Sequence, residues 1–389
     1  MNYLASKLSY FQESVIREMT RKATENDAIN LSQGMPDYTP PSILLEGIKE
    51  ALQENEHQYS VTYGRSDLRE KVAEKLEDYN NILYNPEEEI TITCGASEAI
   101  ASSILAILNP NDEALILEPW YENYVPLTYL SNAKPKFVQL NPDNFQIDEE
   151  ILKENINENT KAIFINTPHN PSGKVFSKGE LLLLSDLCND NDLISITDEI
   201  YEYIIYDGLH HISPASINEM FDKTITISGF SKTFSITGWR VGYVVAEKHL
   251  MSGIRKVHDY LTICAPSLLQ VAVMKSFELR EEYYQKLIER YQINRDYLVK
   301  NLSKLKLTPI EPKGAYYLLA DITEFSESDT EFADFLVKNQ GVATVPGSSF
   351  YQKDRDNPES KKYVRFSFSH KLETLQEAIS RIETRLKEK

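Results

Sequence analysis

The chain has 389 residues, with 41 basic and 59 acidic side chains and a formal net charge of −18. This length allows more than one domain and a large apolar core. Such an acidic chain is a poor candidate for binding nucleic acid or an anionic membrane surface. No apolar run approaches the ~20 residues of a membrane helix, and the first residues lack a secretory signal pattern.

The three cysteines, Cys94, Cys188 and Cys264, are odd in number and none belongs to a C-x-x-C motif. Sparse and unpaired cysteines are typical of proteins in a reducing compartment. We therefore expect reduced thiols and a cytoplasmic enzyme or binding protein.

From residue 89 onward, short apolar or β-branched runs alternate with helical patterns. A run at Glu89–Thr93 leads into an apolar-periodic helix from Ser97 to Leu108, and similar strand-like runs follow at 113–119, 136–140, 161–168, 193–200, 224–228 and 241–247. Buried strands alternating with helices predict an α/β fold with a mostly parallel sheet covered on both faces.

The pattern changes near residue 276. One long amphipathic helix is predicted from Ser276 to about Lys304, followed by strand-like runs at 315–322, 342–350 and 363–369 and a charged helix from about Leu372. These elements predict a smaller α+β unit, and we expect the first 45 residues to pack with it. The predicted division is a large domain at 46–276 and a small domain made of 1–45 and 277–389.

Several common motifs are absent from the sequence. The chain has no G-x-G-x-x-G after a strand, no G-x-x-x-x-G-K-[ST], no H-E-x-x-H and no G-x-S-x-G. His210 and His211 are adjacent, and adjacent residues of a strand point to opposite sides. We therefore expect no metal site.

Unusual polar residues follow four of the predicted strands. They are Gly95, Ala96 and Ser97; Asn166 and Asn170; Asp198 and Tyr201; and Lys232 and Arg240. Each group has a plain structural alternative: a turn at "NPSG", a helix cap at Asp198, a solvated loop lysine at Lys232 or a structural ion pair at Arg240. Because ligands bind beyond the carboxyl ends of parallel strands, their convergence on one sheet edge favours a ligand site.

Pyridoxal 5'-phosphate is one cofactor that accounts for the whole set. It requires a lysine, an acid facing its ring nitrogen and a cradle for its phosphate. Lys232 is the candidate nucleophile and proton carrier, and Asp198 is the candidate acid. Arg240 and the helix start at Gly95–Ser97 are the candidate phosphate clamp.

The stretches "SGFSKTFSITGWRVGY", "NTPHNPSGKVFS", "TDEIYEYIIYDG" and "YVRFSFS" together resemble the fold-type I, class I/II aminotransferases that depend on pyridoxal phosphate. The nearest likeness is to the subgroup of kynurenine, methionine and aromatic aminotransferases, and it covers nearly the whole chain. The resemblance implies a large domain with a mostly parallel seven-stranded sheet between helices, and a smaller α+β domain.

The resemblance also implies the roles of individual residues toward the cofactor. Lys232 matches the Schiff-base lysine, Asp198 the partner of the pyridine nitrogen, and Tyr201 and Asn170 the groups that bond the ring 3-hydroxyl. Tyr121 matches an aromatic residue that stacks on the ring. The positions that match the phosphate site are Gly95, Ala96, Ser97, Ser231 and Arg240.

On the substrate side, Arg365 resembles the arginine that binds the α-carboxylate in bidentate fashion. Gly34, Asn166 and Asn170 match further substrate positions. Tyr59 matches a tyrosine that reaches the phosphate in the other subunit, which implies a homodimer with shared active sites.

Two departures from the family pattern concern the phosphate site. Some relatives carry a serine three positions before the lysine, where this chain has Gly229, so Ser228 or Ser231 is expected to substitute unless the contact is absent. Some aspartate-preferring relatives place a lysine where this chain has Ser97, and this difference weakens the aspartate interpretation.

The implied reaction moves an amino group from an L-amino acid to a 2-oxo acid such as 2-oxoglutarate by a ping-pong mechanism. The segment Val257–Pro266, which resembles a side-chain pocket wall supplied by the partner subunit, offers Tyr260, Ile263 and Cys264 and favours aromatic or large uncharged donors. Aspartate aminotransferase and cysteine-S-conjugate or cystathionine β-lyase remain alternatives. Transcription regulators with an aminotransferase-like domain are disfavoured by the acidic charge.

Overall fold

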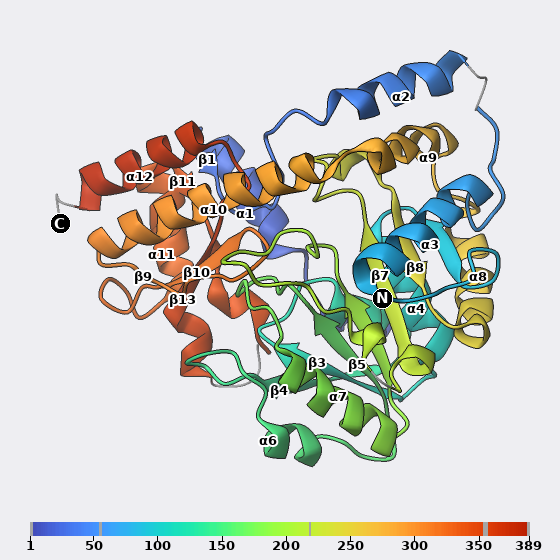
Figure 1. Ribbon diagram of the computed structural model, residues 1–389. Helices are drawn as coiled ribbons and strands as arrows, with labels where there is room; N and C mark the ends of the chain where they lie inside the picture. The colour runs from blue at the N-terminus through green and yellow to red at the C-terminus, as the bar shows by residue number, and fades with distance from the viewer. Residues whose placement is uncertain (1–2, 54–56, 218, 353–356, 387–389) are drawn as a thin grey trace.

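The protein is seen in a computed structural model that describes residues 3–53, 57–217, 219–352 and 357–386. Seven strands form its main sheet, in the order β2-β8-β7-β6-β5-β3-β4 (Figure 1). β8 is antiparallel to both neighbours, and the other neighbouring strands are parallel. The strands are β2 (Ile90–Thr93), β3 (Glu113–Glu118), β4 (Lys134–Gln139), β5 (Thr160–Asn166), β6 (Ile194–Asp198), β7 (Thr224–Gly229) and β8 (Gly242–Val245). The prediction of a mostly parallel seven-stranded sheet is confirmed.

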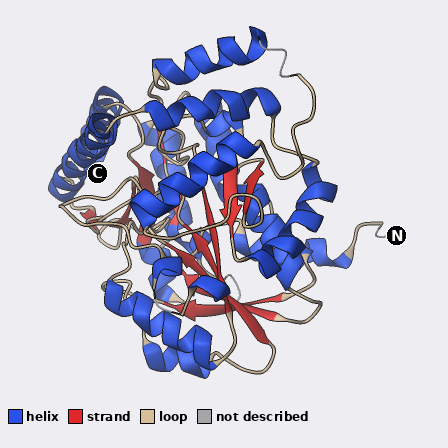
Figure 2. Ribbon diagram, turned by 45° about the vertical axis from the view of Figure 1, so that its right-hand side comes forward, coloured by secondary structure: helices blue, strands red, loops and turns tan. Residues whose placement is uncertain are grey.

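Helices cover both faces of this sheet (Figure 2). Because side chains alternate along a strand, Ile116 and Phe164 face the core formed with α4 (Ala96–Ile107), α5 (Tyr124–Leu130) and α8 (Lys248–Thr262). Leu115 and Ile163 face the opposite core, formed with α6 (Glu149–Glu154) and α7 (Lys178–Asp190). On that side α3 (Ser66–Asn80) and α9 (Ser267–Met274) cover β2 and β8.

A second sheet lies in the C-terminal part of the chain, at the left of Figure 1. It is antiparallel, in the order β12-β13-β10-β9, with β9 (Thr308–Pro309), β10 (Tyr317–Asp321), β12 (Val345–Pro346) and β13 (Tyr363–Ser367). Helices α1 (Val15–Glu25), α10 (Glu281–Lys304), α11 (Asp329–Phe335) and α12 (Leu372–Leu386) surround it, whereas α2 (Ser42–Gln53) lies beside α9.

The N-terminal segment joins the C-terminal part through a strand pair. Strand β1 (Ile29–Asn30) runs parallel to β11 (Val342–Ala343), and α1 contributes Met19 and Ala23 to the same core as α10 and α12. The division of the chain into domains at residues 45 and 276 stays a prediction.

The predicted helix from Ser276 to Lys304 is interrupted. A 3₁₀ turn occupies Lys275–Glu278, Leu279 and Arg280 are extended, and α10 begins at Glu281. Leu279 packs into the core next to α3 and α9, which is why the chain leaves the helical path there. Within the described residues, no helix combines the length and apolar character needed to cross a bilayer.

Candidate active site

Ten of the fourteen predicted site residues line one cavity at the carboxyl ends of β5, β6 and β7. Ala96 and Ser97 come from the start of α4, and the others from the strand ends and the loops that follow them: Tyr121, Asn166, Asn170, Asp198, Tyr201, Ser231, Lys232 and Arg240. Asn166 pairs with Asp198, and Asp198 with Ile227, across adjacent parallel strands. The parallel register therefore brings together groups that are far apart in the sequence.

Asp198 ends β6 with a carboxylate that is almost fully buried. Its Oδ2 accepts a hydrogen bond from the Tyr124 hydroxyl at 2.9 Å, and its Oδ1 accepts one from the Ile200 amide at 3.3 Å. Burial raises the pKa of Asp198 to about 6, although both hydrogen bonds and the charge of Lys232 act in the opposite direction. A positively charged ring nitrogen beside the Asp198 carboxylate would offset the free energy that burial adds to its ionised form.

Lys232 lies in the loop after β7, and its Nζ donates to the Gly34 carbonyl at 3.1 Å. The ammonium is 5.9 Å from the ring centres of both Tyr201 and Tyr316. Desolvation, followed by the charge of Arg240, lowers the pKa of Lys232 to about 8. An amine with this pKa is available as a nucleophile near neutral pH.

The turn from β2 into α4 lies against Arg240. Gly95 has a φ of 77°, and a Cβ on it would lie 2.6 Å from the Arg240 Nη2. Arg240 itself has a φ of 55°, and its guanidinium donates to the carbonyls of Thr237 at 2.9 Å and Cys94 at 3.4 Å. Only glycine at position 95 lets the arginine approach the helix start, where free backbone amides suit an anion.

The structure distinguishes the two serines that were expected to substitute at Gly229. The Ser228 hydroxyl is buried and donates to Glu202 Oε1 at 2.7 Å, away from the cavity, whereas Ser231 lines the cavity. A Cβ on Gly229 would lie 2.7 Å from the Gly242 Cα. Gly229 is therefore required by the close approach of β7 and β8, and Ser231 is the serine available to a ligand.

Arg365, on β13, is completely buried. Its Nη1 donates to Asn170 Oδ1 at 2.8 Å and its Nη2 donates to the Ser32 carbonyl, while Nε has no hydrogen-bond partner. The guanidinium lies 4.3 Å from the ring centre of Tyr317 and 4.9 Å from that of Phe350. A buried arginine with a free donor is equipped to bind an anionic group.

Gly34 and the two asparagines hold this part of the site together. A Cβ on Gly34 would lie 1.7 Å from the Tyr317 hydroxyl, so no other residue fits there. The Tyr317 hydroxyl is also 3.1 Å from that of Tyr201. Asn166 donates to the Asp198 carbonyl at 2.8 Å and accepts from the Asn170 amide at 2.7 Å.

Tyr59 is the predicted site residue that lies apart from the cavity. It is 77% exposed, in the segment between α2 and α3. Tyr260, at 92%, and Ile263, at 47%, are exposed as well. The expected contact of Tyr59 with the cofactor phosphate of another subunit stays a prediction.

Two tyrosines of the site were not predicted. Tyr124, on α5, binds Asp198, and Tyr317, on β10, stacks on Arg365. The rings of Tyr121 and Tyr124 lie 5.6 Å apart, although Tyr121 precedes α5. Tyr124 and Tyr317 both stand next to apolar residues in the sequence, and nothing there marks them as groups that bind Asp198 or Arg365.

A buried charged cluster lies behind the Asp198 turn. His211 Nε2 is 2.5 Å from Glu199 Oε2, and Glu202 Oε2 is 2.5 Å from Lys75 Nζ. Glu199, Glu202 and His211 have a metal-like arrangement. However, the Lys75 ammonium already supplies the positive charge beside Glu202, and the Glu199 carboxylate also accepts bonds from Thr197 and Ser213. The cluster is therefore read as an internal ion-pair network.

Comparison with known proteins identifies the family. The profile described as aminotransferase class I and II matches residues 26–382. The chain belongs to this family. The aminotransferase is 34% identical to human kynurenine–oxoglutarate transaminase 1 over 92% of each chain, and 36% identical to aspartate aminotransferase from Pyrococcus abyssi over 99% of each chain. Its fold matches N-succinyldiaminopimelate aminotransferase from Mycobacterium tuberculosis with a TM-score of 0.94 and 32% identity, covering 98% and 99% of the two chains.

Members of this family use pyridoxal 5'-phosphate, and the aminotransferase is an enzyme of this type. Its cavity fits the cofactor. It offers a lysine of lowered pKa, a buried carboxylate whose charge a cationic ring would stabilise, and a glycine that makes room for an arginine beside free helix amides. The relatives act on different substrates at similar identity, so the donor has to be argued from the site itself.

Proposed function

We propose that this aminotransferase transfers the amino group of an aromatic or large uncharged L-amino acid to a 2-oxo acid such as 2-oxoglutarate. The observation that carries the proposal is the arrangement of cations. Among the described residues that line the cavity, Lys232 and Arg240 are the only cations, and Arg365 lies behind Asn170. With the first two assigned to the cofactor, one cation is left for the α-carboxylate that donor and acceptor share, and none is left for the short side-chain carboxylate of aspartate. Because its chain is one methylene longer, 2-oxoglutarate can place its second carboxylate farther from this region.

Lys232, Asp198 and Arg240 are the residues that we assign to the cofactor. Lys232 would hold it covalently, Asp198 would face its ring nitrogen, and Tyr201 and Asn170 would bind its ring hydroxyl. Tyr121 would cover the ring, and the residues that would hold the phosphate are Gly95, Ala96, Ser97, Ser231 and Arg240. When bound, pyridoxal phosphate supplies an electron-withdrawing ring that stabilises negative charge at the donor α-carbon.

In the proposed mechanism, Arg365 binds the α-carboxylate of the donor and so fixes the direction of the α-carbon–hydrogen bond. The donor amine would displace Lys232 from the cofactor, so the Lys232 Nζ becomes a free amine, takes the α-proton and passes it to the cofactor; with the acceptor bound it moves a proton in the reverse direction. Asp198 remains ionised during these steps because a positive charge faces it. Asn166 and Asn170 keep Asp198 and Arg365 in place through their hydrogen bonds.

Glu122 supports a preference for donors without a side-chain carboxylate. It follows Tyr121, and both of its carboxylate oxygens accept from the Ser14 hydroxyl, at 2.8 and 2.7 Å. Burial raises the pKa of Tyr121 and of Tyr317 above the ordinary tyrosine value, and the negative charge of Glu122 adds to both effects. This charge reaches the region of Arg365 and would repel an acidic side chain.

The exposed residues Tyr59, Tyr260 and Ile263 support a homodimer. We assign Tyr59 to the cofactor phosphate of the partner subunit, and Tyr260 and Ile263 to the wall of its donor pocket. Large apolar side chains that are this exposed are typical of an interface. The three cysteines are unpaired, which favours a reducing compartment, and we place the enzyme in the cytoplasm.

The test is a panel of donors with 2-oxoglutarate, in which the visible band of the bound cofactor is followed in single half-reactions. Phenylalanine, tyrosine, kynurenine, methionine and glutamine should react with kcat/KM at least about tenfold above aspartate, a difference of about 1.4 kcal/mol. A parallel assay for pyruvate release without an acceptor detects β-lyase chemistry. Faster reaction with aspartate would refute the proposed preference.

A charge-neutral variant sharpens this experiment. Glu122→Gln should raise kcat/KM for aspartate several-fold and leave that for methionine unchanged, because it removes a repulsion that only the acidic donor meets. The matched control is Glu13→Gln, since Glu13 is exposed, lines the same surface pocket as Glu122 and pairs with Arg21. An equal effect of both variants would mean that Glu122 has no special role.

A further inference from the structure

A buried histidine lies directly behind the start of α4. His258, on α8, is completely buried, and its Nδ1 is 3.1 Å from both carboxylate oxygens of Glu98. Its Nε2 is 2.7 Å from the Thr62 carbonyl. A carbonyl can only accept a hydrogen bond, and so can an ionised carboxylate, so both ring nitrogens must donate. This geometry requires a positively charged imidazolium paired with a negative Glu98.

Glu98 belongs to the first turn of α4, the turn that contains Ala96 and Ser97. Its Oε2 accepts from the Cys94 amide at 3.2 Å, and the Cys94 carbonyl accepts from Arg240. The carboxylate therefore lies behind the turn that we assign to the cofactor phosphate. A phosphate bound at this turn and the buried Glu98 carboxylate behind it would repel each other, and burial strengthens that repulsion. Without a counter-charge, Glu98 would oppose binding of the phosphate.

We propose that His258 is a positioning residue for the cofactor: its imidazolium neutralises Glu98, and this charge permits tight binding of the phosphate at the start of α4. The inference rests on the proposed assignment of the phosphate site. It also gives the enzyme a pH-dependent affinity for its cofactor. Once His258 loses its proton, the pair carries one negative charge, and the phosphate is held more weakly.

The surroundings of His258 are consistent with a stable charge. Burial lowers its pKa, but the hydrogen bond and charge of Glu98 outweigh this effect, with help from the Thr62 carbonyl and Asp259, and the pKa is raised overall. Thr262 Oγ1 lies 3.3 Å from Nδ1. Because the pKa is raised, the positive charge is present at low pH and is lost as the pH rises through the raised value.

Three other ionisable groups lie nearby. The Cys94 thiol follows β2, and burial and then the charge of Glu98 raise its pKa, so that it stays neutral near pH 7. Cys264 follows α8, and its carbonyl accepts from the Cys94 thiol. Arg255, one turn earlier on α8, donates to the carbonyls of Glu87 and Ile90, so it is directed away from Glu98. Among these neighbours, none replaces the counter-charge of His258.

The test measures the affinity of the cofactor-free enzyme for pyridoxal phosphate by the visible band, between about pH 7 and 9.5, where the phosphate stays a dianion because its second pKa is about 6. Glu98→Gln keeps the shape of the side chain, and its amide can hydrogen-bond to a neutral His258. The affinity of this variant for pyridoxal phosphate should therefore not depend on the protonation of His258. Compared with that of Glu98→Gln, the affinity of the wild type for pyridoxal phosphate should fall roughly tenfold from pH 7 to 9.5, because the nearby positive charge of His258 is lost.

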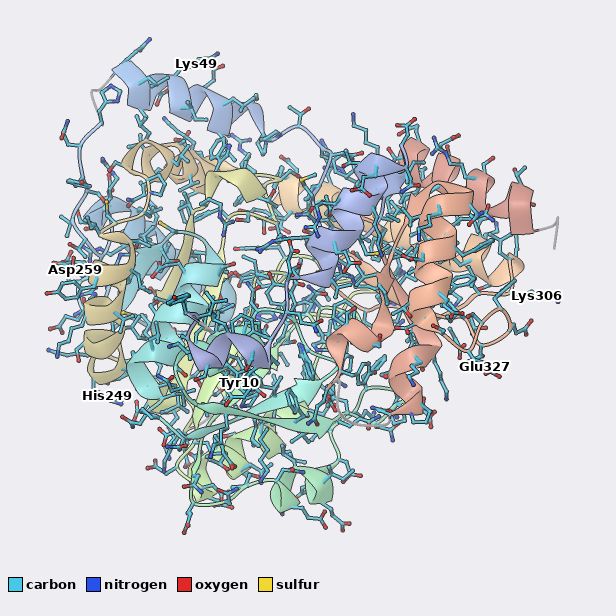
Figure 3. All side chains as sticks on the ribbon, turned by 180° about the vertical axis from the view of Figure 1, so that it is seen from behind. Tyr10, Lys49, His249, Asp259, Lys306 and Glu327 are labelled. Atoms are coloured by element: carbon cyan, nitrogen blue, oxygen red, sulfur yellow. The ribbon has the colours of Figure 1, made fainter. Side chains whose placement is uncertain are left out.

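His258→Gln leaves the Glu98 charge without a partner, so it should bind pyridoxal phosphate roughly tenfold more weakly than Glu98→Gln at every pH, and the wild type should approach it as the pH rises. The double variant Glu98→Gln/His258→Gln should recover the affinity of Glu98→Gln, a rescue that a merely structural role does not predict. His249→Gln is the matched control on the same helix: His249 pairs with Glu247 but is exposed, at the outer edge of the molecule in Figure 3. It should match the wild type.

Pyridoxal, which lacks the phosphate, separates this inference from the assignment of the site. Its affinity should be the same in the wild type and in all four variants. Equal pH dependence of the wild type and Glu98→Gln would overturn the inference, and so would a double variant as weak as His258→Gln. If the wild type bound pyridoxal as tightly as pyridoxal phosphate, the phosphate assignment would itself be wrong and the inference would fall with it.

Discussion

Replacement of Asp198 by asparagine should abolish transamination and yet stabilise the cofactor-free protein. The pKa of Asp198 is about 6 in the folded chain, against 3.8 for an ordinary aspartate. The difference is about two units, and each unit corresponds to about 1.4 kcal/mol, so ionised Asp198 destabilises the fold by about 3 kcal/mol near pH 8. An amide does not ionise, so this cost disappears. Its Oδ1 can still accept from the Ile200 amide, and the Tyr124 hydroxyl can turn to accept from its Nδ2.

The sign of the pH dependence follows from the raised pKa. Between pH 4 and 6 the folded state binds more protons than the unfolded state at this site, so the wild type loses stability as the pH rises through that window. The advantage of Asp198→Asn should therefore be about 1 kcal/mol near pH 4.5 and reach about 3 kcal/mol near pH 8.

The assay is urea unfolding of the cofactor-free wild type and variant at one protein concentration and at both pH values. Asp143→Asn, a change at an exposed aspartate, is the control and should leave the free energy of unfolding unchanged. The reasoning would be refuted if Asp198→Asn were no more stable than the wild type near pH 8, or if the difference were the same at both pH values.

Three further predictions concern the reaction. Lys232→Ala should lose all transamination activity, while its circular dichroism spectrum stays that of the native protein. In the wild type, the rate of cofactor attachment should rise about tenfold from pH 7 to 9, because the pKa of Lys232 is about 8 and the free amine is the reactive form. Near-normal turnover of the variant would exclude Lys232. Arg365→Lys should raise the KM for amino acid donors roughly tenfold to a hundredfold, since lysine cannot form a bidentate pair, and an unchanged KM would give Arg365 a purely structural role. Tyr124→Phe removes a hydrogen bond to the Asp198 carboxylate worth about 1.5–3 kcal/mol, so kcat/KM should fall about tenfold and its acid limb should move to higher pH; a profile superimposable on that of the wild type would contradict this.

The sequence located most of the site because of one physical rule. Parallel strands end at the same edge of the sheet, so Asn166, Asp198 and Lys232 could be placed together without knowledge of the fold. Tyr124 and Tyr317 escaped the prediction because a buried aromatic residue in an apolar run looks the same whether it packs or donates a hydrogen bond. The choice between Ser228 and Ser231 also required coordinates, since it depends on which hydroxyl Glu202 already binds.

The interrupted helix before α10 is a second feature that the sequence pattern did not predict. Helical periodicity continues through Ser276 to Lys304, and no proline marks a break. The extended residues Leu279 and Arg280 are explained only by where Leu279 packs. Local pattern fixes the kind of element, and tertiary packing sets its bounds.

The stretch Ser32–Gly34 has a consequence for mutational scanning of this enzyme. Its main-chain carbonyls accept from Arg365 and from Lys232, and every amino acid carries such a carbonyl. Ser32 is fully buried and its hydroxyl donates to Asn30 Oδ1, so large side chains would not fit there, but Ser32→Ala would leave the main-chain acceptor for Arg365 in place and hide its role. Gly34 would score as intolerant for a different reason, its closeness to Tyr317. The dependence of two reactive side chains on this stretch would become visible only in insertions or deletions, which move the backbone itself.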